Sequence, residues 1–302
     1  MADDQGAGIV DASVFDPPHA AVAGAVRLAL AEDLLPLGDL TAALVSPSVI
    51  RSVAVVSRVA GVVAGRACAV ETLAQVDPAV KVAWRLADGS AVTPGSVVAV
   101  FTGPLRSILT AERTALNFLG HLSGIATLTR AFVDVVMAAN PNTRVIDTRK
   151  TTPGLRSLEK AAVRAGGGTN HRGSLSDAVL IKDNHLGGIT ISEAVGRAKR
   201  LWPGRMVEVE CDREEQLSEA LAAGATVVML DNMTSDQVKA CVAQVQDGGT
   251  ATLVEVSGGV DLESAPGYAA AGADLISVGA LTHSAPVLDL GLDLMPDLGG
   301  GD

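Results

Sequence analysis

The chain has 302 residues, of which 48% are hydrophobic and only 2% aromatic, and it carries a formal net charge of −11 at pH 7. This length is sufficient for two domains, or for one barrel with an appendage. A core of alanine, valine, leucine and isoleucine suits parallel strands that are covered by helices on both faces. Because nucleic-acid-binding domains are typically basic, the acidic balance excludes nucleic acid as an expected partner.

Cysteine usage and the amino terminus indicate the compartment. The three cysteines form an odd set without a Cys-x-x-Cys spacing, so we expect neither a disulfide framework nor a zinc site. The first residues, MADDQGAGIVDASVFD, lack the positive region and apolar stretch of a signal peptide. No stretch approaches the length that is needed to cross a bilayer. We therefore expect a soluble, cytoplasmic protein with no membrane partner.

The first third of the chain predicts a small α/β layer. Residues 17–33 have helical spacing of apolar positions, and Asp39 in the following turn can cap what comes next. Residues 51–59 and 97–101 are β-branched runs bounded by glycine and proline, which indicates strands. Residues 109–137 are helical in pattern and predict two helices that break between Gly120 and Gly124, where the chain passes into a second domain.

After residue 140 short apolar runs recur, and each is followed by polar residues or glycine. The last four of these polar or glycine positions, Glu210, Asp231, Ser257 and Gly279, are 21, 26 and 22 residues apart, and helical patterns separate them. Strand, polar tip and helix in repetition predict a β/α barrel whose tips share one rim. An open doubly wound sheet is the structural alternative. The six runs are 145–146, 178–181, 206–209, 227–230, 253–256 and 275–278.

A cationic block interrupts this acidic chain. Residues 144–182 contain eight lysines or arginines and three acids, a local excess of +5. A focused field of one sign attracts an oppositely charged ligand even when the net charge opposes it. The block therefore predicts a small polyanionic substrate.

Within the block, five residues are candidates for binding anions. Arg149, Arg172 and His171 can present donors to carboxylates, whereas Lys150 and Lys182 act as movable point charges. Together they suit a dicarboxylate and a pyrophosphate. Three other cations, Arg156, Lys160 and Arg164, recur every four residues and favour a solvated helix face instead.

Glu210 and Asp231 follow neighbouring apolar runs, so on a barrel their carboxylates lie near each other at the rim. Two carboxylates there suit Mg²⁺, which keeps substrate phosphate oxygens in its remaining positions, or a ribose diol. The alternative interpretation makes them loop caps or partners of nearby arginines.

The last two runs lead into glycine turns whose backbone N–H groups can bind phosphate. The alternative is that these glycines only supply the positive φ of tight turns. His283 can donate to the same phosphate or cap a helix. The candidate phosphate residues are Ser257, Gly258, Gly259, Gly279, Ala280 and His283.

The string DTRKTTPGLRSLEKAAVRAGGGTNHRGSLSDAVLIKDNH at 147–185 resembles the quinolinate phosphoribosyltransferase family, also called carboxylating nicotinate-nucleotide pyrophosphorylases. Shorter segments in the family's order support the resemblance over most of the chain: GDLT (38–41), TAERTALNFLGHLSGIAT (110–127), VEVEC (207–211), MLDNM (229–233), EVSGGV (255–260) and ISVGALTHSAP (276–286). The departures are Gly173 and Ser174, where a bulky residue and glycine are usual, and Ala161, where tyrosine is common. They affect loop shape more than reaction type.

The resemblance implies an amino-terminal α/β sandwich at 1–124, on which 286–302 can pack, and an incomplete, TIM-like β/α barrel at 125–285. It also implies a homodimer in which Arg113 reaches the neighbour's site. By the same match Thr148, Arg149 and Lys150 line the substrate site, and His171, Arg172 and Lys182 meet the carboxylates. Glu210 and Asp231 then serve the ribose and the metal, directly or through water, and Lys150, Glu210 and Asp231 are the catalytic candidates.

The implied reaction joins quinolinate to 5-phosphoribosyl 1-pyrophosphate with loss of carbon dioxide and pyrophosphate. It gives nicotinate mononucleotide for NAD synthesis, with Mg²⁺ and no organic cofactor. One alternative is a related phosphoribosyltransferase that uses nicotinate, although the number of cations favours a diacid. Another is a non-catalytic anion-binding relative, which the presence of both Glu210 and Asp231 disfavours.

Overall fold

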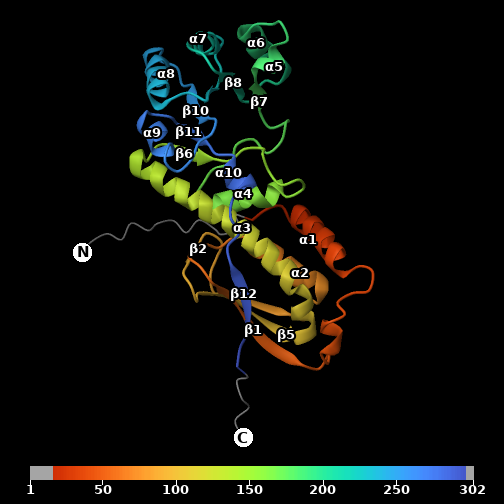
Figure 1. Ribbon diagram of the computed structural model, residues 1–302. Helices are drawn as coiled ribbons and strands as arrows, with labels where there is room; N and C mark the ends of the chain where they lie inside the picture. Colours follow the sequence, from red (N-terminus) through yellow and green to blue (C-terminus); the bar gives the residue numbers. More distant parts are fainter. Residues whose placement is uncertain (1–15, 297–302) are drawn as a thin grey trace, which may run out of the picture. The chain divides into compact units, whose positions relative to one another are not determined.

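The computed structural model describes residues 16–296, so the amino-terminal stretch and the last six residues lie outside the described part (Figure 1). Within it the chain forms two compact units, 16–126 with 287–296 and 127–286. The expected absence of a signal peptide therefore concerns residues outside the description.

The first unit contains a four-stranded antiparallel sheet in the order β12-β1-β5-β3. Valines of β1 and β5 pack with Phe101, Leu73 and Leu119 in a fully buried core. The predicted helix at 17–33 and the predicted strands at 51–59 and 97–101 are confirmed. The elements are α1 (His19–Leu34), η2 (Ala42–Leu44), β1 (Ile50–Ser57), β2 (Gly61–Val62), α2 (Arg66–Val76), β3 (Lys81–Trp84), β4 (Ala91–Val92), β5 (Val97–Pro104), the first part of α3 (Leu105–Ala139) and β12 (Leu290–Leu294).

The predicted cap at Asp39 is also confirmed. Its Oδ1 accepts hydrogen bonds from the backbone N–H groups of Thr41 at 3.0 Å and Ala42 at 2.8 Å. These bonds satisfy donors at the start of η2 that have no partner within the helix.

The predicted break in the long helical segment is wrong, because α3 is one helix of 35 residues. Glycine in a helix interior costs about 1 kcal/mol relative to alanine, but Gly120 allows a close approach of the chain. A Cβ at Gly120 would lie 3.0 Å from the backbone oxygen of Leu288, whose N–H donates to the Gly120 oxygen at 2.9 Å. Burial of Ile108, Leu119 and Ile125 further stabilises the continuous helix.

The expectation that no segment has the length and composition to cross a membrane is wrong for α3. The helix includes an 18-residue window with a mean hydropathy of 1.4. Half of that window is buried inside the protein.

The second unit is built on a six-stranded sheet in the order β6-β11-β10-β9-β8-β7, with every pair parallel. All six predicted strands are present. The strands are β6 (Arg144–Ile146), β7 (Val179–Ile181), β8 (Val207–Cys211), β9 (Val227–Asp231), β10 (Leu253–Ser257) and β11 (Leu275–Ser277). The helices are the last part of α3, α4 (Arg156–Ala165), α5 (Asp183–Leu186), α6 (Ile191–Leu201), α7 (Glu214–Ala222), α8 (Ser235–Asp247), α9 (Ala265–Ala270) and α10 (Ala280–His283).

The strand order distinguishes an incomplete barrel from an open doubly wound sheet. The first strand, β6, pairs with the last, β11, and the strands from β7 to β11 follow one another in chain order. A doubly wound sheet instead reverses its strand order at an interior switch point. In the described residues no strand ladder joins β6 to β7, and the predicted incomplete β/α barrel is therefore confirmed.

The solvated face predicted for α4 is wrong. Lys160 is only 6% exposed and forms an ion pair with Asp147, which is fully buried. Asp147 also accepts hydrogen bonds from Asn170 Nδ2 at 2.7 Å and from the backbone N–H of His171 at 2.9 Å. The periodicity of the cations is real, but one of them is paired inside the unit, where an acid compensates its charge.

Removal of Asp147 is therefore expected to destabilise the protein strongly. Asp147→Ala leaves the ammonium of Lys160 buried without its carboxylate, and we expect a loss of about 3–5 kcal/mol in the free energy of unfolding. Asp293→Ala, which breaks the exposed ion pair with Arg58, is the matched control and should change stability little. Urea denaturation of both variants measures the difference. Equal losses for the two would contradict the structural role of the buried pair.

Candidate active site

The candidate site lies at the carboxyl ends of the parallel strands of the second unit. Because the strands run in one direction, residues that follow them share one rim. Of the predicted residues, Thr148, Arg149 and Lys150 follow β6, Lys182 follows β7, Glu210 and Asp231 lie near the ends of β8 and β9, and Ser257 ends β10. Gly258 and Gly259 come next, and Gly279 and Ala280 follow β11.

Lys182 and Glu210 form an ion pair between Lys182 Nζ and Glu210 Oε2. The pairing follows from strand register, since Ile181 of β7 lies opposite Val209 of β8. The Lys182 and Glu210 side chains are 38% and 17% exposed, so both remain accessible at the rim. The backbone N–H of Lys182 donates to His185 Nδ1 at 3.0 Å, so this histidine holds the start of α5.

Glu210 and Asp231 lie on the same face of two paired strands. Glu210 is opposite Met229, and Asp231 comes two residues after Met229. Alternation along the strand therefore directs both carboxylates to one side. Two carboxylates in this arrangement are a donor set that Mg²⁺ accepts.

Asn232 connects the loops after β9 and β10, a role that the sequence interpretation missed. Its Nδ2 donates to Asp231 Oδ2 at 2.7 Å, and its backbone N–H donates to the oxygen of Ser257 at 3.0 Å. Its φ is +56°, a left-handed conformation in which asparagine is enriched among non-glycine residues. An asparagine directly after a strand-end aspartate is the sequence signal that could have found it.

Gly258 requires the absence of a side chain for two reasons. Its φ is +96°, and an added Cβ would lie 2.2 Å from Asn232 Oδ1. Gly259 has a φ of +57°, and nothing lies within 4 Å of where its Cβ would be. The turn therefore has both the positive φ of a tight turn and an open backbone position beside Asp231.

A second group gathers where the loops after β6 and β11 meet. Thr282 Oγ1 donates to the backbone oxygen of Lys150 at 2.7 Å. A Cβ at Gly279 would lie 3.1 Å from His283 Nε2 and 3.2 Å from Lys150 Cδ. The backbone N–H of Lys150 donates to Thr148 Oγ1 at 3.0 Å. Lys150, His283 and the Gly279 backbone are thus close enough to bind one anion.

Arg149 and Arg172 are cations that lie within electrostatic reach of each other. Burial lowers the pKa of Arg172, and the charge of Arg149 lowers it further. Arg172 Nη1 donates to the backbone oxygen of Ala178 at 3.2 Å. Arg149 Nε is buried and has no hydrogen-bond partner within the described residues. Two neighbouring guanidinium groups with unused donors favour an anionic ligand.

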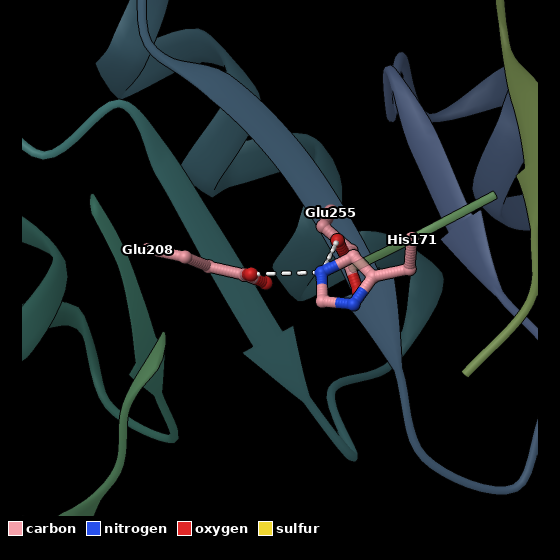
Figure 2. Close-up of side chains that lie close together, drawn as sticks. All are labelled: His171, Glu208 and Glu255. Carbon is pink, nitrogen blue, oxygen red and sulfur yellow. Dashed lines mark hydrogen bonds and ion pairs between the residues drawn. The ribbon is translucent and has the colours of Figure 1, made fainter. Parts of the chain in front are cut away.

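His171 lies against two buried carboxylates that sequence reasoning did not select (Figure 2). Its Nε2 is 2.8 Å from Glu208 Oε2 and 3.5 Å from Glu255 Oε2. Burial lowers the pKa of His171, but the hydrogen bond to Glu208 and the charges of both glutamates outweigh it, so the pKa is raised overall. Burial raises the pKa of Glu255 to about 8. Glutamates inside apolar strands were the available signal.

Gly173 and Ser174, which depart from the family's usual sequence, lie in a turn that is hydrogen-bonded to Asp177. The backbone N–H groups of Gly173 and Ser174 donate to Asp177 Oδ2 at 2.7 Å and 3.0 Å. Arg156 Nη1 donates to the oxygen of Gly173 at 3.1 Å. Ala161 is buried.

Arg113 belongs to a different unit from the other candidates. It lies in the part of α3 that belongs to the first unit, and its side chain is exposed. Its assignment to a substrate site therefore stays a prediction that rests on the resemblance.

Comparison with known proteins places this geometry in a family. Residues 39–123 match the N-terminal domain of quinolinate phosphoribosyl transferases, and residues 125–293 match the C-terminal domain. A nicotinate-nucleotide pyrophosphorylase [carboxylating] of Mycobacterium leprae is 42% identical over 89% of this chain and 95% of its own length. A protein of Bacillus subtilis named "Probable nicotinate-nucleotide pyrophosphorylase [carboxylating]" is 42% identical over 85% of this chain and 88% of its own length.

A solved structure agrees with these sequence matches. The nicotinate-nucleotide pyrophosphorylase of Francisella tularensis superposes with a TM-score of 0.89 at 38% identity, over 93% of this chain and 99% of the other. Both domains, in the same order, are therefore accounted for. The chain belongs to the quinolinate phosphoribosyl transferase family.

Proposed function

We propose that the protein transfers the phosphoribosyl group of 5-phosphoribosyl 1-pyrophosphate to quinolinate and releases carbon dioxide, pyrophosphate and nicotinate mononucleotide. The observation that carries the proposal is the gathering of Arg149, Arg172 and His171 on the barrel that also presents Glu210 and Asp231. Membership of the family and the names of the matched relatives support it. The product serves the synthesis of pyridine nucleotides.

The three donors suit the two carboxylates of the pyridine. The guanidinium groups of Arg149 and Arg172 repel each other, so a bound carboxylate relieves an unfavourable interaction as well as forming new bonds. Lys182, which Glu210 holds in an ion pair, adds a further positive charge at the same rim. Thr148 lies between β6 and the two cations that follow it, and it completes the substrate-binding set.

The phosphate groups of the second substrate suit the two glycine turns. Ser257, Gly258 and Gly259 offer backbone donors beside Asp231, while Gly279 and Ala280 do so beside Lys150, with the His283 ring next to Gly279. Backbone N–H groups in such turns bind anions without a side chain in the way.

Glu210 and Asp231 fit Mg²⁺, directly or through water, because they supply the one or two carboxylates that this ion takes beside substrate phosphates. When bound, Mg²⁺ would neutralise the charge of the pyrophosphate. Asn232 holds the Asp231 carboxylate in place. No organic cofactor is needed for the reaction.

The chain's residues act on charges that develop during the reaction. As the pyrophosphate leaves, positive character develops at the anomeric carbon, and the carboxylate of Glu210 or Asp231 favours that state. Lys150 stabilises the departing anion. The pyridine nitrogen then attacks. Carbon dioxide then leaves from the ring carbon next to the quaternary nitrogen, whose positive charge stabilises the electron pair left on that carbon until a proton takes the place of the carboxylate. This step needs mainly a site of low dielectric constant.

The proposal includes a homodimer that works in the cytoplasm. Arg113 is exposed on α3, in a different unit from the other candidates. We propose that it reaches the substrate of the partner subunit and that each site takes residues from both chains.

The test of the function is an assay of the purified protein with phosphoribosyl pyrophosphate, Mg²⁺ and quinolinate that is labelled in the carboxyl group next to the nitrogen. We expect labelled carbon dioxide and pyrophosphate in equal amounts. Turnover of nicotinate with no release from quinolinate would identify the alternative phosphoribosyltransferase. Binding of the diacid without pyrophosphate would identify an anion-binding protein.

Lys150→Ala is expected to lower kcat by about 100-fold or more, the scale of a preorganised charge that acts on a transition state. Lys239→Ala, on the exposed face of α8, removes the same charge elsewhere and is the control. Steady-state kinetics measures both. Near-normal turnover of the folded Lys150 variant would remove this lysine from the mechanism.

Arg113 gives a complementation test of the shared site. A subunit with Arg113→Ala and a subunit with Lys182→Ala are each expected to form inactive homodimers. Their heterodimer should regain part of the activity, because one of its two sites contains both native residues. A purified heterodimer that stays inactive would argue against a site built from two chains.

Gly258→Ala tests the close contact between the loops after β9 and β10. Gly188 has a φ of +94° with nothing within 4 Å of its Cβ position, so Gly188→Ala carries the backbone strain alone. We expect Gly258→Ala to lower the thermal midpoint more and to lower kcat/KM by at least about tenfold, since Asn232 must move. The same effect in both variants would show that φ alone matters.

A further inference from the structure

We propose that Glu208 and Glu255 are positioning residues that hold His171 as a positively charged donor for a carboxylate of the substrate. The proposal rests on the proposed function and adds two residues that make no contact with substrate themselves. They act on the charge and orientation of the histidine.

Contacts in this cluster hold both the backbone and the imidazole ring of His171. Its backbone N–H donates to Asp147 Oδ1 at 2.9 Å, and its backbone oxygen accepts from Lys160 Nζ at 3.1 Å. Its ring meets Glu208 of β8 at 2.8 Å and Glu255 of β10 at 3.5 Å, both through Nε2 (Figure 2). Such a ring has little freedom to rotate.

The charge of the cluster follows from burial. Glu208 and Glu255 are both 0% exposed, and buried like charges cannot both persist without compensation. Glu255 Oε1 accepts a hydrogen bond from Ser277, while Glu208 Oε1 and Glu255 Oε2 have no hydrogen-bond partner in the described residues. Burial raises the pKa of Glu255 to about 8, which favours release of one negative charge from this buried pair. A protonated His171, whose Nε2 lies 2.8 Å from Glu208 Oε2 and 3.5 Å from Glu255 Oε2, compensates the negative charge that remains.

This balance decides what the free ring nitrogen offers to a ligand. No hydrogen bond joins His171 Nδ1 to the described residues. In an imidazolium both ring nitrogens donate, whereas a neutral ring with its proton on Nε2 presents a lone pair at Nδ1. The lone pair would repel a carboxylate, and the N–H would form a charge-assisted bond with it. The two glutamates thereby determine whether His171 attracts or repels the carboxylate of the substrate.

A divalent cation is the competing occupant. One ligand atom each from His171, Glu208 and Glu255 lies within 4.8 Å of the others, a spacing that a metal ion can also use. A metal would take the lone pair of Nε2 and require neutral His171. Hydrogen bonding and metal binding therefore predict opposite charges on the ring.

The experiment compares two isosteric variants by nuclear magnetic resonance and kinetics. In protein with ¹⁵N-labelled histidine at neutral pH, we expect both ring nitrogens of His171 to carry protons, with resonances assigned by a His171→Gln variant. Glu208→Gln removes the balancing charge, so the ring should become neutral. The KM for quinolinate should then rise about tenfold to a hundredfold, the scale of one charge-assisted hydrogen bond, with a smaller change in kcat.

Glu255→Gln is the matched control, since the Glu255 carboxyl group lies farther from His171 Nε2 than that of Glu208 and an amide of the same shape replaces it. His171 should stay charged, and KM should change by less than about threefold. A His171 ring that remains charged in Glu208→Gln, or equal rises of KM in the two variants, would overturn the proposal. So would stoichiometric metal in the purified protein that both substitutions remove.

Nuclear magnetic resonance measures the charge of His171 and does not require the protein to turn over substrate. Failure of the native protein to consume quinolinate would therefore count against the proposed function, while the state of the ring would still test the role of the two glutamates.

Discussion

The parallel direction of six strands is the constraint on which the site depends. Because every strand ends at the same rim, side chains from distant parts of the sequence become neighbours there. Side chains two residues apart on one strand point to the same face but lie at different depths below the rim. On β8, Glu208 is fully buried and Glu210, two residues closer to the strand end, is partly exposed. A buried layer of carboxylates next to His171 therefore lies beneath an accessible layer at the rim.

The acids within the cationic block have a specific structural use. Asp147 accepts hydrogen bonds from Lys160, from Asn170 and from the backbone N–H of His171. Glu159 is fully buried and accepts from the backbone N–H of Thr152 at 3.1 Å. These carboxylates hold the loops that carry Arg149 and Lys150 on one side and His171 on the other. The excess of positive charge is thereby fixed in place and left available to a ligand.

Much of this arrangement could be predicted from sequence, because the periodic apolar runs specify strands and the residue after each run specifies the rim. The adjacency of Lys182 and Glu210 follows from that logic alone. The continuous α3 could not be predicted, because the packing of Gly120 against Leu288 joins residues far apart in the chain. Lys160 was misjudged since a helical repeat of cations does not reveal a buried acid partner.

The sequence did not indicate roles for Glu208, Glu255 and Asn232, for a related reason. A single acid inside an apolar strand carries no partner information, and the partner of each lies on another strand or loop. Arg113 is a different case, because nothing in its local sequence indicates a ligand. Its assignment depends on the family resemblance.

The central claim is that carboxylates and phosphates meet at the carboxyl ends of β6 to β11. A crystal structure with a pyridine dicarboxylate, a non-reacting analogue of phosphoribosyl pyrophosphate and Mg²⁺ tests it most directly. The account predicts carboxylate oxygens within hydrogen-bonding distance of Arg149, Arg172 and His171 Nδ1, with phosphate on the turns at 257–259 and 279–280. A dicarboxylate bound away from this rim, with those three side chains unengaged, would contradict it.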